Sequence, residues 1–229
     1  MAVCKPAGQA VIPGRGLIEE PLCLQAQRRA GGKIFVVHRI DREASGVVVF
    51  AKNAPAHRRL CQDFESRRAS KTYWAAVAGN PEEAGTIDKP LRLFGSGRMG
   101  AASREASSAG PHKKNALRPG AASNGKPSLT RYRTLERFPR AALVEAHPMT
   151  GRHHQLRAHF FSLGFPILGD PFYGKPPRPV GGFPRLMLHA LELSLPAPTA
   201  APQGAAPMIF RAEPDDDFLR PLARLRAGN

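Results

Sequence analysis

The sequence predicts an α+β fold, in which short β-strands form a sheet and a few helices pack against it. Apolar runs of strand length, rich in β-branched residues, lie at 34–37 and 47–51. Helical periodicity appears at 55–68 and again from 156 to 163. The chain has 229 residues, of which 42 % are hydrophobic, so it can bury a proper core. We expect residues 1–229 to form a single domain.

The charge of the chain is strongly positive. Lys and Arg number 34 against 18 Asp and Glu, a formal net charge of +16. Such a surface attracts polyanions, so RNA, DNA and an anionic membrane are all candidate partners at this point. The three cysteines form no Cys-x-x-Cys pair, which favours a reducing compartment. The sequence contains no signal peptide and no apolar run long enough for a bilayer. We therefore expect a cytoplasmic protein without a membrane partner.

The first part of the chain places one carboxylate among cations. Residues 3–18 predict a short strand, a Lys-Pro turn and a Pro-Gly loop, which leave no room for an N-terminal accessory domain. The segment His-Arg-Ile-Asp-Arg-Glu-Ala-Ser-Gly (38–46) then holds Asp41 between Arg39 and Arg42, at a strand-to-loop junction. Neighbouring cations keep a carboxylate ionised, as a nucleophile or general base must be. An ordinary turn with a surface ion pair would have the same local sequence.

Residues 55–68 predict a helix with an apolar face formed by Ala56, Leu60 and Phe64 and with arginines on its other face. Residues 71–79 predict a strand that begins with Lys-Thr-Tyr and places Tyr73 in line with two small apolar residues. Gly, Ser and Ala dominate residues 95–128, which predict a long irregular, flexible basic loop. Eleven Lys or Arg against two acidic residues lie between 92 and 140, as expected of an arm that orders on a nucleic-acid backbone or of a solvated basic linker.

The second informative cluster is Thr-Gly-Arg-His-His-Gln-Leu-Arg-Ala-His (150–159), which follows two strand candidates, 129–135 and 141–147, that could pair as a hairpin. Apolar residues at 156, 160 and 163 predict an amphipathic helix that ends at Gly164. Its free backbone N–H groups, together with Arg152 and Arg157, would bind a phosphate or a carboxylate. No metal is expected, because His154 and His159 lack an i, i+4 spacing and the arginines oppose a cation.

After a turn-rich connection at 164–173, residues 186–195 predict a strand, and one more strand at 208–212 precedes a charged end. Taken together, separated motifs in this order resemble the RluA-type family of RNA pseudouridine synthases: His-Arg-Ile-Asp-Arg-Glu-Ala-Ser-Gly at 38–46, Lys-Thr-Tyr at 71–73, Gly-Arg-His-His-Gln-Leu-Arg-Ala-His at 151–159, Gly-Phe-Pro-Ile-Leu-Gly-Asp-Pro-Phe-Tyr at 164–173 and Leu-His-Ala at 188–190. The resemblance implies a mixed, mostly antiparallel sheet with flanking helices around one catalytic cleft.

The resemblance also implies roles for individual residues. Asp41 stands where the family has its catalytic aspartate, Tyr73 where it has a tyrosine, and Arg157 where it has the arginine that pairs with the aspartate. Arg39 would help to fill the gap that the target uridine leaves in its stack. The residues expected to contact RNA are Arg39, Arg42, Lys71, Arg152 and His153.

The implied reaction converts uridine to pseudouridine in structured RNA, rRNA or tRNA, with an aspartate nucleophile and without a cofactor or metal. The target uridine would be flipped out of its stack, and the protein would act as a monomer on a stem-loop. Attack at the sugar, attack at the base and a glycal route all stay open. Two other classes are weighed against it. One is a non-catalytic RNA-binding or assembly protein on the same fold, and the other is a hydrolase that uses Asp41 with His38 or His154.

Overall fold

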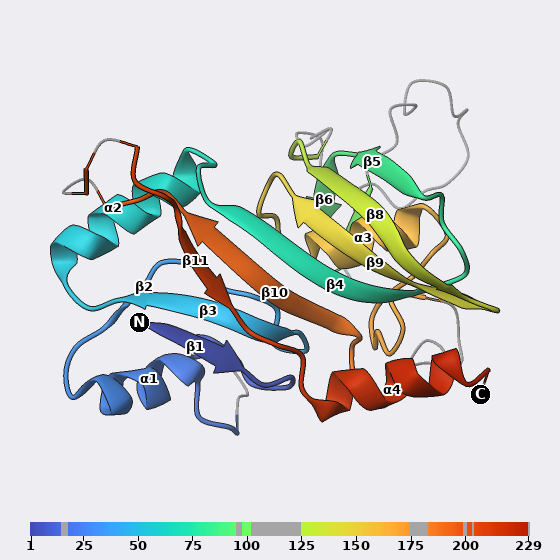
Figure 1. The fold of residues 1–229 in the computed structure, drawn as a ribbon, viewed down its shortest axis with the longest axis horizontal. Helices are drawn as coiled ribbons and strands as arrows, with labels where there is room; N and C mark the ends of the chain where they lie inside the picture. The colour runs from blue at the N-terminus through green and yellow to red at the C-terminus, as the bar shows by residue number, and fades with distance from the viewer. Residues whose placement is uncertain are drawn as a thin grey trace, which may run out of the picture.

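The computed structural model describes residues 1–14, 18–94, 98–101, 125–174, 183–198, 201–202 and 204–228. Nine strands within these residues form one twisted sheet (Figure 1). Along the sheet the order is β1 (Ala2–Lys5), β3 (Ser45–Ala51), β10 (Leu188–Leu195), β4 (Ser70–Ala78), β9 (Ala141–Pro148), β8 (Leu129–Phe138) and β5 (Ala84–Asp88). Two further strands, β2 (Phe35–Val36) and β11 (Met208–Arg211), pair with β3 and β10 respectively.

The sheet is mixed and mostly antiparallel, which confirms the predicted fold class. Among the described pairs, only β3 and β10 run parallel, with Gly46 opposite Ala190. A Cβ atom at Gly46 would lie 2.2 Å from the Ala190 carbonyl oxygen, and its φ is +121°, so this crossing requires glycine. The predicted hairpin of β8 and β9 is also confirmed.

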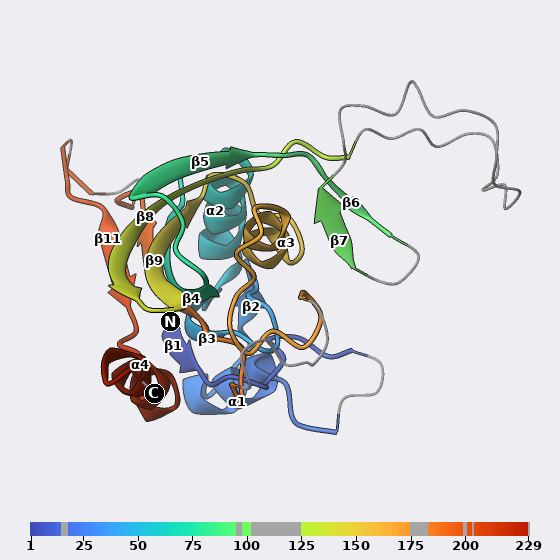
Figure 2. The ribbon, with the colours of Figure 1, turned by 90° about the vertical axis from the view of Figure 1, so that its right-hand side faces the viewer.

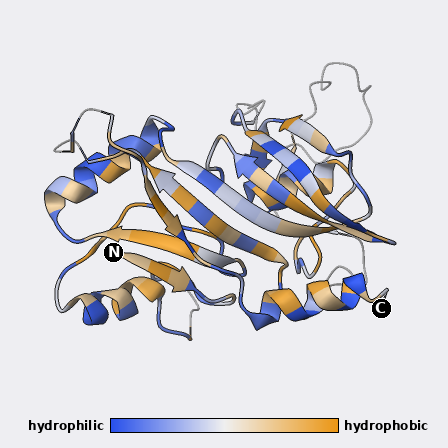
Figure 3. Cartoon of the chain, in the orientation of Figure 1, coloured by the Kyte–Doolittle hydropathy of each residue, from blue (hydrophilic) through white to orange (hydrophobic). Residues whose placement is uncertain are grey.

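Strand β3 is a continuous apolar run because both of its faces are covered (Figure 3). Val48 and Phe50 pack in the same cluster as helix α1 (Leu22–Ala30). Val47 and Val49 face the other way, into the cluster that contains Leu60 of helix α2 (Ala54–Glu65). These contacts fix the strand that follows the 38–46 motif.

Helix α2 begins as predicted and ends three residues earlier than predicted. The Asn53 side chain accepts a hydrogen bond from the Ala56 N–H at 2.9 Å, and Pro55 lies in the first turn. The chain leaves the helix after Glu65, and Arg67 has a φ of +58°. This left-handed residue turns the chain toward β4, and Arg67 lines the cleft described below.

Helix α3 (Gln155–Ser162) differs from the predicted amphipathic helix, because Gln155 to Phe160 are all buried. Leu156 and Phe160 pack against the sheet, as the spacing predicts. The opposite side is covered as well, because Ala158 packs with Tyr173 and with the small two-stranded sheet of β6 (Leu91–Leu93) and β7 (Met99–Ala101). Figure 2 shows that small sheet beside α3. Arg157 is therefore fully buried rather than at a surface.

Two helices were not predicted. Helix α1 ends at Gly31, which has a φ of +65° and whose N–H bonds to the Arg28 carbonyl. Helix α4 (Asp216–Arg226) forms where the sequence predicts only a charged end, and it buries Phe218 and Leu222 against the sheet. Pro221 lies inside α4 and weakens the helical pattern in the sequence.

The prediction of an irregular loop at 95–128 is wrong for its two ends. β7 lies within this range and pairs with β6, and Lys126 forms a bridge with Leu91. The remainder of that prediction, at 95–97 and 102–124, falls outside the described residues. Within the described parts of the chain, no helix is long and apolar enough to cross a membrane.

Candidate active site

A polar cleft of about 530 Å³ lies where the 38–41 segment, the start of β4, the end of α2 and the turn before α3 meet. Predicted site residues from three separate parts of the sequence line it: Arg39, Asp41, Lys71, Tyr73 and Arg152. Arg157 is buried next to Asp41, and His153 lies exposed beside it. The fold therefore brings the predicted residues together, with the exception of Arg42.

Arg42 points away from Asp41. Its Nε donates to the Gly8 carbonyl oxygen at 2.7 Å, and the side chain is exposed. The cation that does approach Asp41 is Arg157, whose Nη1 lies 3.6 Å from the Asp41 carboxylate. The prediction that Arg42 flanks Asp41 in space is wrong, because the turn at 42–44 reverses the chain immediately after the aspartate.

Asp170 holds Arg157 more closely than Asp41 does. Nε and Nη2 of Arg157 each donate to Asp170 at 2.8 Å, a bidentate pair between two side chains with 0 % exposure. Asp170 also accepts the backbone N–H groups of Phe172 and Tyr173. The remaining Nη1 of Arg157 serves Glu43, at 3.1 Å, and Asp41. Arg157 thus presents one fixed edge of its guanidinium to the acidic residues of the cleft.

The pKa of Asp41 is raised, mainly because burial penalises its charged form. The positive charges of Arg157, His153 and Arg39 act in the opposite direction and limit the rise. Neighbouring cations thus favour the ionised form, as the sequence predicts, but burial has the larger effect on the pKa of this carboxylate. The side chain is 17 % exposed, and a partly desolvated carboxylate beside one fixed arginine is a stronger base and nucleophile than a surface aspartate.

Tyr73 lies on the floor of the cleft, on β4. Burial and the negative charge of Asp41 both raise the pKa of its hydroxyl above the ordinary value. The phenol is therefore protonated at neutral pH. Its ring offers a flat apolar surface inside the cleft, and its hydroxyl offers a proton near Asp41.

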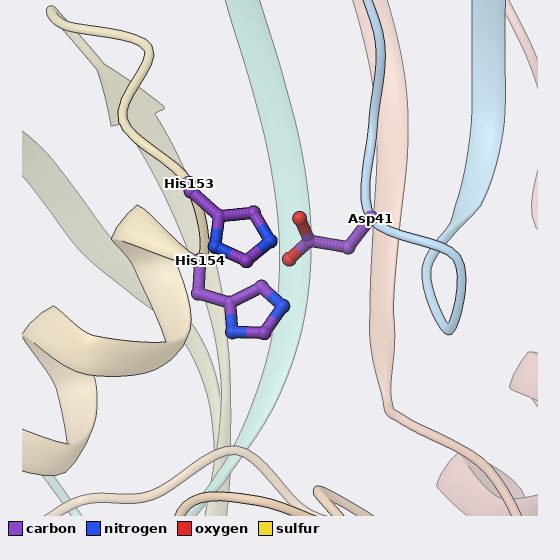
Figure 4. Close-up of side chains that lie close together, drawn as sticks. All are labelled: Asp41, His153 and His154. Atoms are coloured by element: carbon purple, nitrogen blue, oxygen red, sulfur yellow. The ribbon is translucent and has the colours of Figure 1, made fainter. Parts of the chain in front are cut away.

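His153 and His154 face the Asp41 carboxylate from the start of α3 (Figure 4). Their rings stack with centroids 3.8 Å apart, and one donor atom from each, together with a carboxylate oxygen of Asp41, lies within 4.8 Å of the others. The donor types would suit a transition metal. The guanidinium of Arg157 lies 3.6 Å from the same carboxylate, however, and opposes a cation there.

His38 and His154 are both engaged in structural contacts. His38 Nε2 accepts the Val49 N–H at 2.9 Å, its ring stacks on Phe64, and burial lowers its pKa to about 3. His154 has a φ of +50°, lies 3.2 Å from the Tyr173 hydroxyl, and has a pKa lowered to about 3, chiefly by burial. His38 therefore has no free acceptor with which to act as a hydrolytic base, which weakens the hydrolase alternative.

Lys5 is a residue of the site that the sequence reasoning missed. Its side chain has 0 % exposure, and Nζ donates to the carbonyl oxygens of Pro6, Gln9 and Arg42 at 2.9, 2.7 and 2.9 Å. Burial lowers the pKa of Lys5 to about 7. The bond to Arg42 fastens the chain immediately after Asp41 to strand β1. The predicted Lys-Pro turn contains this lysine, but only the fold shows which carbonyl groups its ammonium binds.

Asp170 and Glu43 were also missed as partners of Arg157. Both stand inside motifs that were noticed, yet the spacing of 13 residues between Arg157 and Asp170 gives no local signal. A buried arginine implies an acidic partner. The sequence alone predicts an amphipathic helix with Arg157 at its surface, so the need for an acidic partner becomes evident only when the structure shows that α3 is buried on all sides.

Comparisons with known proteins agree with this fold and cleft. The family model described as RNA pseudouridylate synthase matches residues 1–162. The chain is 35 % identical over 217 residues to the dual-specificity RNA pseudouridine synthase RluA of Escherichia coli (strain K12), covering 94 % of this chain and 89 % of that protein. It is 34 % identical over 237 residues to the ribosomal large subunit pseudouridine synthase D of Nitrosomonas europaea, covering 97 % of this chain and 61 % of that protein.

A solved structure is also similar. Human RNA Pseudouridylate Synthase Domain Containing 4 superposes with a TM-score of 0.76 at 28 % identity, over 98 % of this chain and 89 % of that one. The chain spans 57 % of an uncharacterized RNA pseudouridine synthase of Chloroflexus aurantiacus, to which it is 37 % identical over 198 residues. The chain belongs to the RNA pseudouridylate synthase family. The resemblance predicted from the separated motifs is thereby confirmed.

Proposed function

We propose that this protein isomerises specific uridines of structured RNA to pseudouridine, with Asp41 as the nucleophile. The observation that carries the proposal is the meeting of Asp41, Tyr73 and Arg157 at one cleft, from sequence positions far apart. A protein that only bound RNA would have no need of a desolvated carboxylate beside a fixed arginine. The alternative of a non-catalytic RNA-binding or assembly protein therefore leaves this arrangement unexplained.

The reaction must break the bond between C1′ and N1, turn the detached base, and join C1′ to C5. The base loses a proton from C5 and gains one at N1, so no electrons are exchanged with a cofactor. The Asp41 carboxylate supplies the electron pair that the first step needs. Arg157, held by Asp170, orients that carboxylate and favours its charged form. Tyr73 stacks on the uracil and relays the C5 proton. Its hydroxyl takes that proton as it passes its own to the Asp41 carboxylate, which left C1′ when the bond to C5 formed, and Asp41 then releases the proton to solvent, from which N1 gains one.

The cleft is too small for a duplex, so the target uridine enters it flipped out of its stack. Unstacking costs a few kcal/mol, and the positive charge around the opening offsets this cost through contacts with phosphates. Arg39 lies exposed at the opening, where it can occupy the place that the base leaves. Arg152 and His153 lie beside it at the start of α3.

The proposal includes the kind of RNA and the form of the protein. The name of one relative refers to the ribosomal large subunit, which supports rRNA as a substrate, and that of another refers to dual specificity for RNA. The substrate that we propose is a stem-loop of rRNA or tRNA. We propose that residues 1–229 act as one catalytic domain and as a monomer in the cytoplasm. Neither a metal nor a small-molecule cofactor is needed for the isomerisation.

A map of pseudouridine in total RNA, by chemical adduct and primer extension, tests the proposal. The map compares cells with and without the gene, and then cells that carry the wild-type protein or a variant. One or more sites are expected to vanish with the gene and to return with the wild type and with Asp88→Asn, an exposed acid away from the cleft. Asp41→Asn should restore none of them. An unchanged map, with tight RNA binding by the purified protein, would favour the non-catalytic alternative.

Asp41→Asn also serves as its own folding control. The raised pKa of Asp41 means that the folded state disfavours the ionised form relative to the unfolded state. Stability is therefore lost as the pH rises from 3.8 through the raised pKa, and a neutral amide avoids this loss. We expect Asp41→Asn to melt no lower than the wild type at neutral pH, so that inactivity cannot be ascribed to unfolding.

A further inference from the structure

Lys71 is a cation of the cleft that has neither a hydrogen-bond acceptor nor an acidic partner among the described residues. It lies half-buried at the start of β4, two residues before Tyr73, and lines the cleft. Burial lowers the pKa of Lys71, and no carboxylate acts to raise it. Among the described residues, its ammonium has no hydrogen-bond acceptor and no acid within ion-pair distance. A desolvated ammonium without a counter-charge is unfavourable unless a ligand supplies one.

Other buried cations near the cleft are fully used by the protein itself. Arg157 pairs with Asp170, Glu43 and Asp41, and Lys5 donates to three carbonyl oxygens. Lys71 differs from them in its position, because its side chain lines the cleft, where a bound molecule would contact it. Its free charge is thus a property of the cleft and not of the protein core.

The surroundings of Lys71 hold it in place without occupying its donors. The ammonium lies 5.6 Å from the centre of the Phe64 ring, a cation–π contact, and Phe64 is itself stacked on His38. On another side is Gly151, so close that a Cβ atom there would lie 3.3 Å from Lys71 Nζ. Gly151 is exposed, and its backbone N–H finds no acceptor in the described chain. Two unsatisfied donor groups therefore lie side by side at one wall.

We propose that Lys71 and the Gly151 turn form a subsite for the RNA phosphate that adjoins the flipped uridine. The inference rests on the proposed function, since it is the flipped nucleotide that brings a phosphodiester into the cleft. An anionic phosphate oxygen satisfies both donor groups at once, whereas a neutral base edge would leave the ammonium without a counter-charge. Arg67 lines the same wall with its side chain free of described partners, and it adds a second positive charge at the opening.

The position of the subsite gives it a second consequence. Lys71 and Tyr73 are two residues apart on one strand, so their side chains lie on the same face of β4. A phosphate held at Lys71 therefore belongs to the nucleotide whose base lies against Tyr73. Binding at this subsite adds affinity equally to the ground state and the transition state, while the positioning of the reacting atoms stays with Asp41.

The test replaces Lys71 by Met and measures binding and turnover separately. Binding is followed by fluorescence anisotropy with a labelled hairpin RNA whose loop is all uridine, across a range of salt concentrations. Lys71→Met should bind about tenfold more weakly at low salt, and its plot of log affinity against log salt should be shallower by about 1. Lys71→Arg should restore the slope, because it keeps the charge.

A matched control is available in the same protein. Lys33 also lies over a phenylalanine ring, that of Phe35 at 5.2 Å, but it is exposed and does not line the cleft. Lys33→Met should leave both affinity and salt slope close to those of the wild type. Thermal melting of all three variants excludes loss of the fold as the cause of weak binding.

Turnover is measured on RNA isolated from cells that lack the gene. Lys71→Met should raise KM about tenfold and leave kcat near that of the wild type. A lower kcat with an unchanged KM and salt slope would overturn the proposal and assign Lys71 to the chemistry. An affinity and slope like those of Lys33→Met would overturn it as well. If the wild type itself forms no pseudouridine, the proposed function fails, whereas the binding result at Lys71 still stands by itself.

Discussion

The two walls of the cleft treat their charged groups in opposite ways. On the Asp41 side, Lys5 donates to three carbonyl oxygens, and Arg157 is held by Asp170 and Glu43. On the opposite side, Lys71 lies over Phe64 with no acceptor among the described residues. On the Asp41 side, the protein itself supplies the partners of these charged groups, and they hold the reacting carboxylate in place. On the Lys71 side, we propose that a phosphate of the bound RNA supplies the missing counter-charge. Substitutions on the two sides should therefore have different effects on stability and on RNA binding.

The largest effect is expected from Arg157→Met. Asp170 would then be left as a buried carboxylate with only two backbone donors, and such a broken pair costs about 3–5 kcal/mol of unfolding free energy. Activity should vanish too, because Asp41 loses the cation that fixes it. Urea unfolding measures the loss, with Arg220→Met in the exposed pair with Asp216 as a control that changes stability by less than about 1 kcal/mol. Equal stability of both variants would contradict the account of the Asp41 side.

A smaller but distinct effect is expected from Lys5→Met. Three buried or partly buried carbonyl groups lose their donor, which should lower the unfolding free energy by about 2–4 kcal/mol. The kcat of the folded variant should also fall, because the chain after Asp41 is no longer bonded to β1. Chemical denaturation and kcat on the RNA that the map identifies provide the two readings. A stable variant with full kcat would show that the bond to the Arg42 carbonyl is dispensable.

The smallest effect concerns the pH profile. If Asp41 must be ionised, kcat/KM rises with pH through its raised pKa, so the acid limb lies above the ordinary value of 3.8. Arg39→Met removes a charge that favours the ionised form, and the limb should move to higher pH. Lys71→Met serves as the contrast: it should weaken binding and leave the limb in place. If the acid limb of Arg39→Met lies at the same pH as that of the wild type, the limb does not report the ionisation of Asp41.

Much of this site was predictable because its residues stand in contiguous motifs. Asp41, Tyr73 and Arg157 were found from the sequence, and the fold brings them to one cleft. The spacing of residues in the sequence could not identify Asp170 as the partner of Arg157. The two side chains meet only because α3 packs between the main sheet and the segment that contains Tyr173. The spacing also misplaced Arg42, because two residues that are neighbours in sequence diverge at the turn.

The fold shows the same division between local and long-range information. Strands with β-branched runs were placed correctly, and the family resemblance implied the mixed, mostly antiparallel character of the sheet but not its strand order. Helix α4 was missed because Pro221 interrupts its periodic pattern, although Phe218 and Leu222 keep the spacing of a buried face. Helix α1 carried an adequate stop signal at Gly31 but only two buried apolar positions, Leu22 and Ala26. These two segments have weak amphipathic patterns, and they form helices because packing of their few apolar residues in the protein core stabilises them.

Leu91 pairs with Ala101 on one side and with Lys126 on the other, through two backbone hydrogen bonds to Lys126. Ala101 and Lys126, which are far apart in the sequence, thus meet at a single residue of β6. A change at Leu91 would therefore disturb both contacts at once, whereas the main sheet, which includes neither β6 nor β7, would keep its register.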